Sequence, residues 1–146
     1  MNSDEIKYST CMVVSLYRKF VCWWTVVDAT SRVLKSNFQS IVYYLKAHCR
    51  SRANFHRFET MITYPLNVFL NSTQLIKDNL TVLTQEVSNL IELASSNNPV
   101  SEDNFFDVYD IICELQEDLK ENFMDCQKRF KGFCLIRQTI LEHFGE

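Results

Sequence analysis

Glycine and proline are scarce in this chain of 146 residues, which holds two of each. Both glycines, Gly132 and Gly145, lie near the C-terminus, so residues 1–131 contain none. Glycine-rich phosphate loops, dinucleotide-binding turns and nucleophile elbows require glycine at fixed positions. The absence of glycine from residues 1–131 therefore excludes enzyme classes that would need such a loop there.

The chain also lacks long apolar runs. The run Phe20–Val27 has eight residues, whereas a membrane-spanning helix needs about 20. Asp4 and Glu5 stand where a secretory leader would carry basic residues. We therefore expect no transmembrane segment, no signal peptide and an intracellular location, in the cytoplasm or the nucleus.

The sequence contains none of the common metal-binding or catalytic motifs. The six cysteines form no CxxC pair, and the three histidines form no HExxH motif. We expect reduced, buried thiols, with a disulfide framework as the alternative. No serine lies in a GxSxG motif, and the carboxylates form no calcium loop. The sequence thus predicts no metal, no cofactor and no enzymatic activity.

Pro65 and Pro99 divide the chain into blocks 1–64, 66–97 and 100–146, because a residue before proline disfavours helical geometry. In the middle block, apolar residues recur at alternating steps of four and three. They are Ile76, Leu80, Leu83, Val87, Leu90 and Ala94. This spacing predicts a helix with one apolar stripe that ends before Pro99.

The third block begins with Ser101 as a candidate N-cap, followed by two carboxylates that suit the positive end of a helix dipole. Near-helical apolar spacing continues for about 40 residues. The positions are Phe105, Val108, Ile112, Leu115, Leu119, Phe123, Cys126, Phe130, Phe133, Ile140 and Phe144. Gly132 is a place where this helix would bend or split. A helix longer than its neighbours would leave part of its apolar stripe for another chain to cover.

The first block has β-branched and aromatic runs that favour strands. It has no Asn-Gly or Asp-Gly hairpin signal, and Leu34, Phe38, Ile41 and Leu45 follow helical steps. We expect one or two helices in 4–27, another in 31–50 and a short one in 54–63. The sequence predicts a single all-α domain over 1–146, an antiparallel helical bundle of four to six helices with a long C-terminal helix. An α+β domain is the alternative.

Charge divides unevenly along the chain. Residues 1–60 carry a net charge of +5 and residues 61–146 a net charge of −8. Between Glu102 and Asp125, nine carboxylates accompany a single Lys120, as a solvated helix face or as a docking face for a basic partner. The candidate anion-binding residues are Lys46, Arg50, Arg52 and Arg57. A function in binding nucleic acid or anionic lipid through this basic half is an alternative, and the acidic pI of the whole chain argues against nucleic acid.

Aromatic residues are abundant, with 11 Phe, six Tyr and two Trp. Adjacent aromatics on a helix point in different directions, so some of them should approach the surface and anchor a partner. The predicted partner-binding residues are Phe105, Phe106, Tyr109, Phe123, Phe130 and Phe133.

These patterns favour a non-enzymatic protein that acts by protein–protein interaction or assembly, as a homodimer or as a subunit of a complex with coiled-coil packing. The alternative is a small helical-bundle regulator that binds a partner's amphipathic helix, as cell-death and innate-signalling regulators do, viral ones included. An apolar cleft between helices would favour the regulator, whereas a flat self-complementary face would favour the homodimer.

Overall fold

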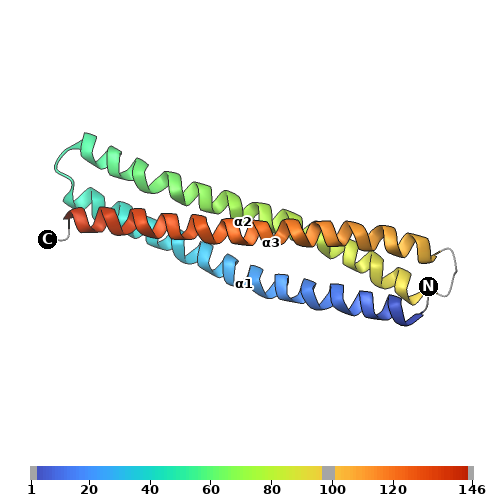
Figure 1. The fold of residues 1–146 in the computed structure, drawn as a ribbon. Coiled ribbons are helices and arrows are strands. Elements are labelled where there is room, and N and C mark those ends of the chain that lie inside the picture. The colour runs from blue at the N-terminus through green and yellow to red at the C-terminus, as the bar shows by residue number, and fades with distance from the viewer. Residues whose placement is uncertain (1–2, 97–100, 145–146) are drawn as a thin grey trace. The chain divides into compact units, whose positions relative to one another are not determined.

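The computed structural model describes residues 3–96 and 101–144. They form three helices, namely α1 (Ser3–His48), α2 (Arg52–Ser95) and α3 (Ser101–Phe144) (Figure 1). No described residue lies in a strand. The all-α prediction is therefore confirmed, the α+β alternative is wrong, and the predicted count of four to six helices is too high.

Helix α1 is continuous, so the predicted breaks near residues 28–30 are wrong. Its core positions recur every seven residues, at Ile6, Val13, Phe20, Val27, Leu34 and Ile41. Four of these side chains are buried, and Ile6 and Val27 are half-buried. A heptad repeat keeps one face of a helix against its neighbours, and this packing outweighs the strand preference of the β-branched residues.

Helix α2 passes through Pro65, so the predicted boundary at that residue is wrong. Proline lacks the N–H that would bind the carbonyl of Met61, a loss of about 3 kcal/mol relative to alanine. Ile62, Leu66 and Phe69 on either side are at most 5% exposed. Burying each such side chain stabilises the fold by about 1.5–3 kcal/mol, enough to keep the helix intact.

The apolar stripe predicted for 76–94 is confirmed. Five of its six members are buried, and Ala94 is half-buried. Helix α2 ends at Ser95, close to the predicted stop, whereas Pro99 lies outside the described residues.

Helix α3 has the predicted start and is not split at Gly132, whose φ is not positive. The side chain of the predicted cap, Ser101, lies outside the described part of the structure. The prediction that α3 is longer than its neighbours is wrong, because the three helices have 46, 44 and 44 residues. Its core residues recur every seven positions and are at most 2% exposed. They are Phe105, Ile112, Leu119, Cys126, Phe133 and Ile140. Of the eleven predicted stripe positions, six are buried and five are half-buried, so none is left exposed for another subunit to cover.

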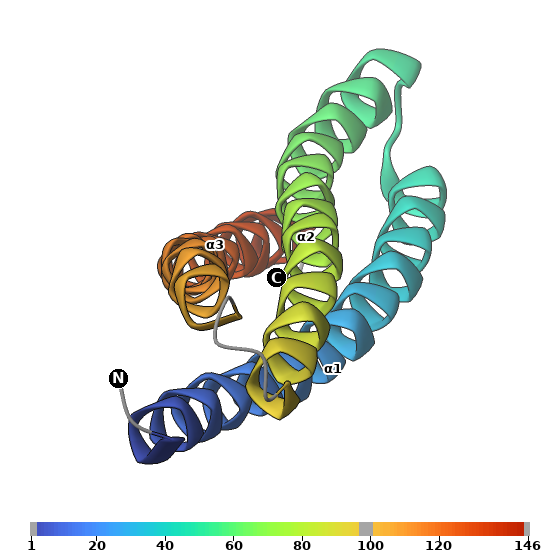
Figure 2. The same cartoon turned by 90° about the vertical axis from the view of Figure 1, so that its right-hand side faces the viewer.

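The contacts of the chain group into two compact units, each built from one segment of every helix. Figures 1 and 2 show the three helices that contribute these segments. Unit 1 comprises Met1–Thr25 and Leu75–Asn122, and unit 2 comprises Val26–Gln74 and Phe123–Glu146. The single domain over 1–146 remains a prediction.

Side chains join the helices within each unit. In unit 1, the buried Gln116 amide of α3 donates a hydrogen bond to the Val13 carbonyl of α1 (3.3 Å), and Tyr17 shares one of 2.9 Å with Thr84 of α2. In unit 2, the rings of Phe69 and Phe130 lie 6.1 Å apart between α2 and α3. Each unit is thus a three-helix bundle with its own core.

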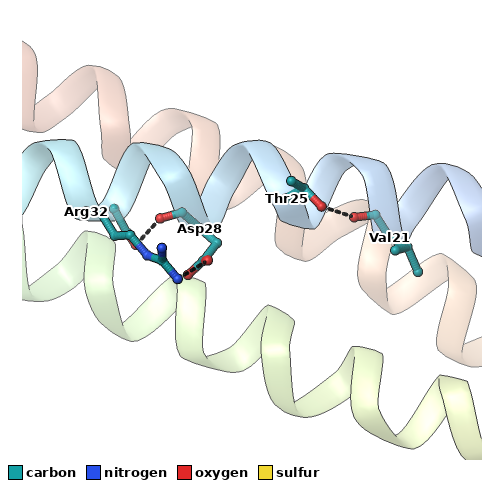
Figure 3. A network of polar contacts seen from close by, with 5 residues as sticks. Val21, Thr25, Asp28 and Arg32 are labelled. Carbon is teal, nitrogen blue, oxygen red and sulfur yellow. Dashed lines mark hydrogen bonds and ion pairs between the residues drawn. The ribbon is translucent and has the colours of Figure 1, made fainter.

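Several polar side chains of α1 bind within their own helix (Figure 3). The Thr25 hydroxyl donates to the Val21 carbonyl at 3.1 Å, and Arg32 pairs with Asp28 at 3.0 Å. A side-chain pair four residues apart, such as Asp28 and Arg32, stabilises a helix by a few tenths of a kcal/mol, whereas a threonine hydroxyl bonded to the carbonyl four residues earlier does not. Both contacts lie within α1, and the packing of α1 against its neighbours depends on its apolar residues.

Candidate protein-binding groove

Unit 2 contains a groove of about 690 Å³ between α1 and α3. Its walls are one face of each helix, with lining residues spaced three or four apart. They are Asn37, Ser40, Ile41 and Tyr44 of α1, and Cys134, Arg137, Gln138, Leu141 and Glu142 of α3. The lining segments span eight and nine residues, which at a rise of 1.5 Å per residue make the groove about 12 Å long, or about two helical turns.

The floor of the groove is apolar. Ile41 is buried at its base, and Leu141 is 39% exposed beside it. The Tyr44 ring stacks on His48 with centroids 4.0 Å apart and meets the edge of Phe144 at 5.9 Å. These contacts restrict the Tyr44 rotamer, so the groove presents a defined apolar surface to a ligand.

The rim of the groove carries a hydrogen-bonded pair of polar side chains and an arginine without an ion pair among the described residues. Gln138 donates a hydrogen bond of 2.9 Å to Glu142, which occupies that carboxylate. Arg137 is half-buried and has no ion pair among the described residues. A guanidinium in this position favours a ligand that brings a carboxylate.

The two units have opposite net charge. Unit 2 has ten Lys and Arg against five Asp and Glu, a net charge of +5, whereas unit 1 has five against 13, a net charge of −8. The charge division that the sequence shows along the chain is therefore also a division between compact units. The groove belongs to the basic unit, which attracts acidic partners at long range.

The predicted anion-binding residues lie together, around the connection between α1 and α2 in unit 2. Lys46 lies in the last turn of α1, Arg50 lies in the connection, and Arg52 and Arg57 lie in the first two turns of α2. All four are exposed, and none forms an ion pair within the described residues. The Arg57 guanidinium lies 5.4 Å from the centre of the Phe58 ring.

The structure separates the six predicted partner-binding residues. Phe105, Phe106 and Tyr109 belong to unit 1, and the other three belong to unit 2. Phe105 and Phe133 are 0% exposed and cannot anchor a partner, because both occupy the buried heptad position of α3. Phe106, Tyr109, Phe123 and Phe130 are half-buried.

The three predicted partner-binding residues of unit 1 pack on one another. The Phe105 ring lies 5.1 Å from Phe106 and 6.2 Å from Tyr109. Burial raises the pKa of Tyr109, and the neighbouring Cys113 and Asp110 raise it further. This cluster completes the packing of unit 1.

Sequence reasoning missed the groove residues Tyr44, Arg137 and Leu141. Arg137 lies one turn after the core residue Phe133, and Leu141 directly follows the core residue Ile140. Both therefore line the edge of the same apolar stripe. A helical wheel drawn on the seven-residue repeat would have found this edge. No sequence signal gives the pairing of α1 with α3 that completes the groove.

None of the six cysteines is paired, which agrees with the expectation of free thiols over disulfides. The expectation that they are buried holds for Cys126 alone, since Cys11 and Cys22 are exposed and the other three are half-buried. Burial raises the pKa of the Cys126 thiol, a hydrogen bond with Ser72 lowers it, and Asp125 raises it.

The described residues contain no group of three His, Cys, Asp or Glu placed to hold a metal ion. Within the same residues, no helix has a stretch apolar enough and long enough to cross a bilayer. The chain matches no family model, no curated protein and no solved structure.

Proposed function

We propose that this chain is a non-enzymatic interaction protein that binds an amphipathic helix of a partner protein in the groove between α1 and α3 of unit 2. The observation that carries the proposal is the groove itself, with an apolar floor of Ile41, Tyr44 and Leu141 and the unpaired guanidinium of Arg137 at its rim. An intracellular location, supported by the six free thiols, is part of the proposal.

A cleft between helices favours this function over a homodimer formed along α3. The expectation of a homodimer depended on an apolar stripe of α3 too long for its own subunit to cover. Six of its eleven members are buried and the other five are half-buried. The groove between α1 and α3 offers an apolar surface between two helices, and such grooves bind helices by their i, i+3, i+4 and i+7 side chains.

The charges in unit 2 specify the partner further. The groove is about two turns long, so two or three apolar side chains of a helix would fill it. Arg137 and the net charge of +5 favour carboxylates beside that apolar stripe. The partner is therefore an acidic amphipathic helix.

Fluorescence anisotropy with two synthetic helical peptides of about 18 residues tests the proposal. One peptide carries leucine at i, i+3, i+4 and i+7 with glutamate on both flanks, and the other replaces every glutamate with lysine. We expect the glutamate peptide to bind more tightly. Leu141→Asp should weaken its binding by about tenfold or more, because it places a charge on the apolar floor.

Leu135→Asp is the matched control, since Leu135 is on the same helix, is 64% exposed and does not line the groove. It should leave the affinity unchanged. Arg137→Gln should reduce the difference between the two peptides. Equal loss of binding in both leucine variants, or equal binding of both peptides to the wild-type chain, would show that the groove is not the binding site.

A further inference from the structure

Unit 2 presents a strongly basic surface that the groove does not use. Tyr43, which is 77% exposed, stands one turn before Lys46 on α1. Together with Arg50, Arg52 and Arg57 these residues form what we call the basic end. An exposed aromatic ring among unpaired cations is a composition typical of interface hot spots, where tyrosine and arginine are enriched.

Unit 1 presents a surface of opposite charge and similar design. Asp107, Asp110, Glu114 and Asp118 lie on one side of α3, and Ile111 stands among them with 48% of its side chain exposed. We call these five residues the acidic face. In the described part of the chain none of its four carboxylates has an ion pair, whereas the nearby Glu117 pairs with Lys120 at 3.2 Å.

We infer that the basic end of one copy of the chain binds the acidic face of a second copy. Each set of residues has four exposed charges of one sign and one exposed hydrophobic residue, so the two are complementary in charge and similar in composition. Like charges within each patch repel one another, and a contact between the two patches relieves both repulsions.

A second copy fits the basic end better than a nucleic acid does. The whole chain has a net charge of −3 and unit 1 has −8, so a phosphate backbone is attracted to unit 2 and repelled by unit 1. A second copy is attracted through both of its units. Because the contact joins two different patches, reciprocal pairing gives a closed dimer, and one-sided pairing gives a chain of copies.

Sedimentation velocity of the full chain, at about 100 µM, in 0.1 M and 1 M NaCl tests the inference. The screening length falls from about 10 Å to about 3 Å between these salt concentrations, so association should be present at the lower and lost at the higher. Tyr43→Ala should weaken association, whereas Tyr64→Ala, at a residue of unit 2 that is 72% exposed and outside the basic end, should not.

Charge reversal makes the test specific. The first variant combines Lys46→Glu, Arg50→Glu, Arg52→Glu and Arg57→Glu. The second combines Asp107→Lys, Asp110→Lys, Glu114→Lys and Asp118→Lys. Each should be monomeric alone, and an equimolar mixture should associate, because both contacts between the two variants are again between opposite charges. All eight positions are exposed, so circular dichroism should show unchanged helix content.

Three results would overturn the inference: a monomeric wild-type chain at the lower salt concentration, association that either variant retains alone, or a mixture that remains monomeric. Binding of the basic end to an RNA oligonucleotide or to anionic vesicles by a chain that stays monomeric would assign it to another partner. Leu141→Asp does not touch either patch, so this test is independent of the peptide-binding test of the groove.

Discussion

Gly132→Ala should stabilise the protein. Gly132 lies inside α3 without a positive φ, and a Cβ atom built there meets no atom within 4 Å. The added methyl group points into a hollow of about 350 Å³ lined by residues of α2 and α3, Pro65 and Val68 among them. Alanine in a helix interior is favoured over glycine by about 1 kcal/mol, and no steric term opposes that gain here.

The gain is measurable by urea unfolding followed by circular dichroism and by thermal unfolding. For a chain of 146 residues, an unfolding entropy of about 2.1 cal/mol/K per residue converts 1 kcal/mol into a rise in Tm of about 3 °C. Ala29→Gly, at an exposed position inside α1, is the matched control and should lower the stability by a similar amount. If Gly132→Ala is neutral or destabilising while Ala29→Gly behaves as expected, the backbone at 132 is not an ordinary helix.

Pro65→Ala should raise the unfolding free energy by about 2 kcal/mol, since it restores the donor for the Met61 carbonyl and gives up some packing of the half-buried ring; chemical denaturation measures it. Iodoacetamide at pH 8 should modify Cys11 and Cys22 first and Cys126 last, as mass spectrometry of digests would show, because the first two are exposed and burial raises the pKa of Cys126. The raised pKa also predicts that the free energy of unfolding falls as the pH rises past about 9, because the folded state binds the Cys126 proton more tightly than the unfolded state. Cys126→Ala should make the free energy of unfolding less dependent on pH in this range. Urea titrations under reducing conditions measure this dependence.

The helical class was predictable because the apolar spacing of 76–94 and of 105–144 is a direct consequence of burying one helix face. Helix boundaries were harder, because they depend on a balance of terms. Pro65 disfavours helix locally, and its effect is visible in sequence, whereas the burial of Ile62, Leu66 and Phe69 that outweighs it is known only once the neighbouring helices are in place.

Two of the six predicted partner-binding residues are core residues for a related reason. Phe105 and Phe133 are large aromatic residues, and large aromatics dominate both cores and interfaces. Their spacing by multiples of seven from Ile112 and Cys126 indicates the core, and both are fully buried. The groove depends instead on Tyr44 and Leu141, which come from helices far apart in sequence. Sequence gives each helix face but not which faces become neighbours.

Core and charge follow different patterns in this chain. In α1 and α3 the buried positions keep one seven-residue repeat through both units, whereas net charge changes from −8 in unit 1 to +5 in unit 2. The repeat therefore determines how each helix packs and does not determine where the charges lie. Consequently, reversing the charge of exposed residues should leave the packing intact and change only association, while changes to the repeat should lower stability without changing the complementarity of the surfaces. Stability and self-association can thus be separated by mutation. A change in association of the charge-reversed variants therefore reports on the contact between copies and not on a loss of folding.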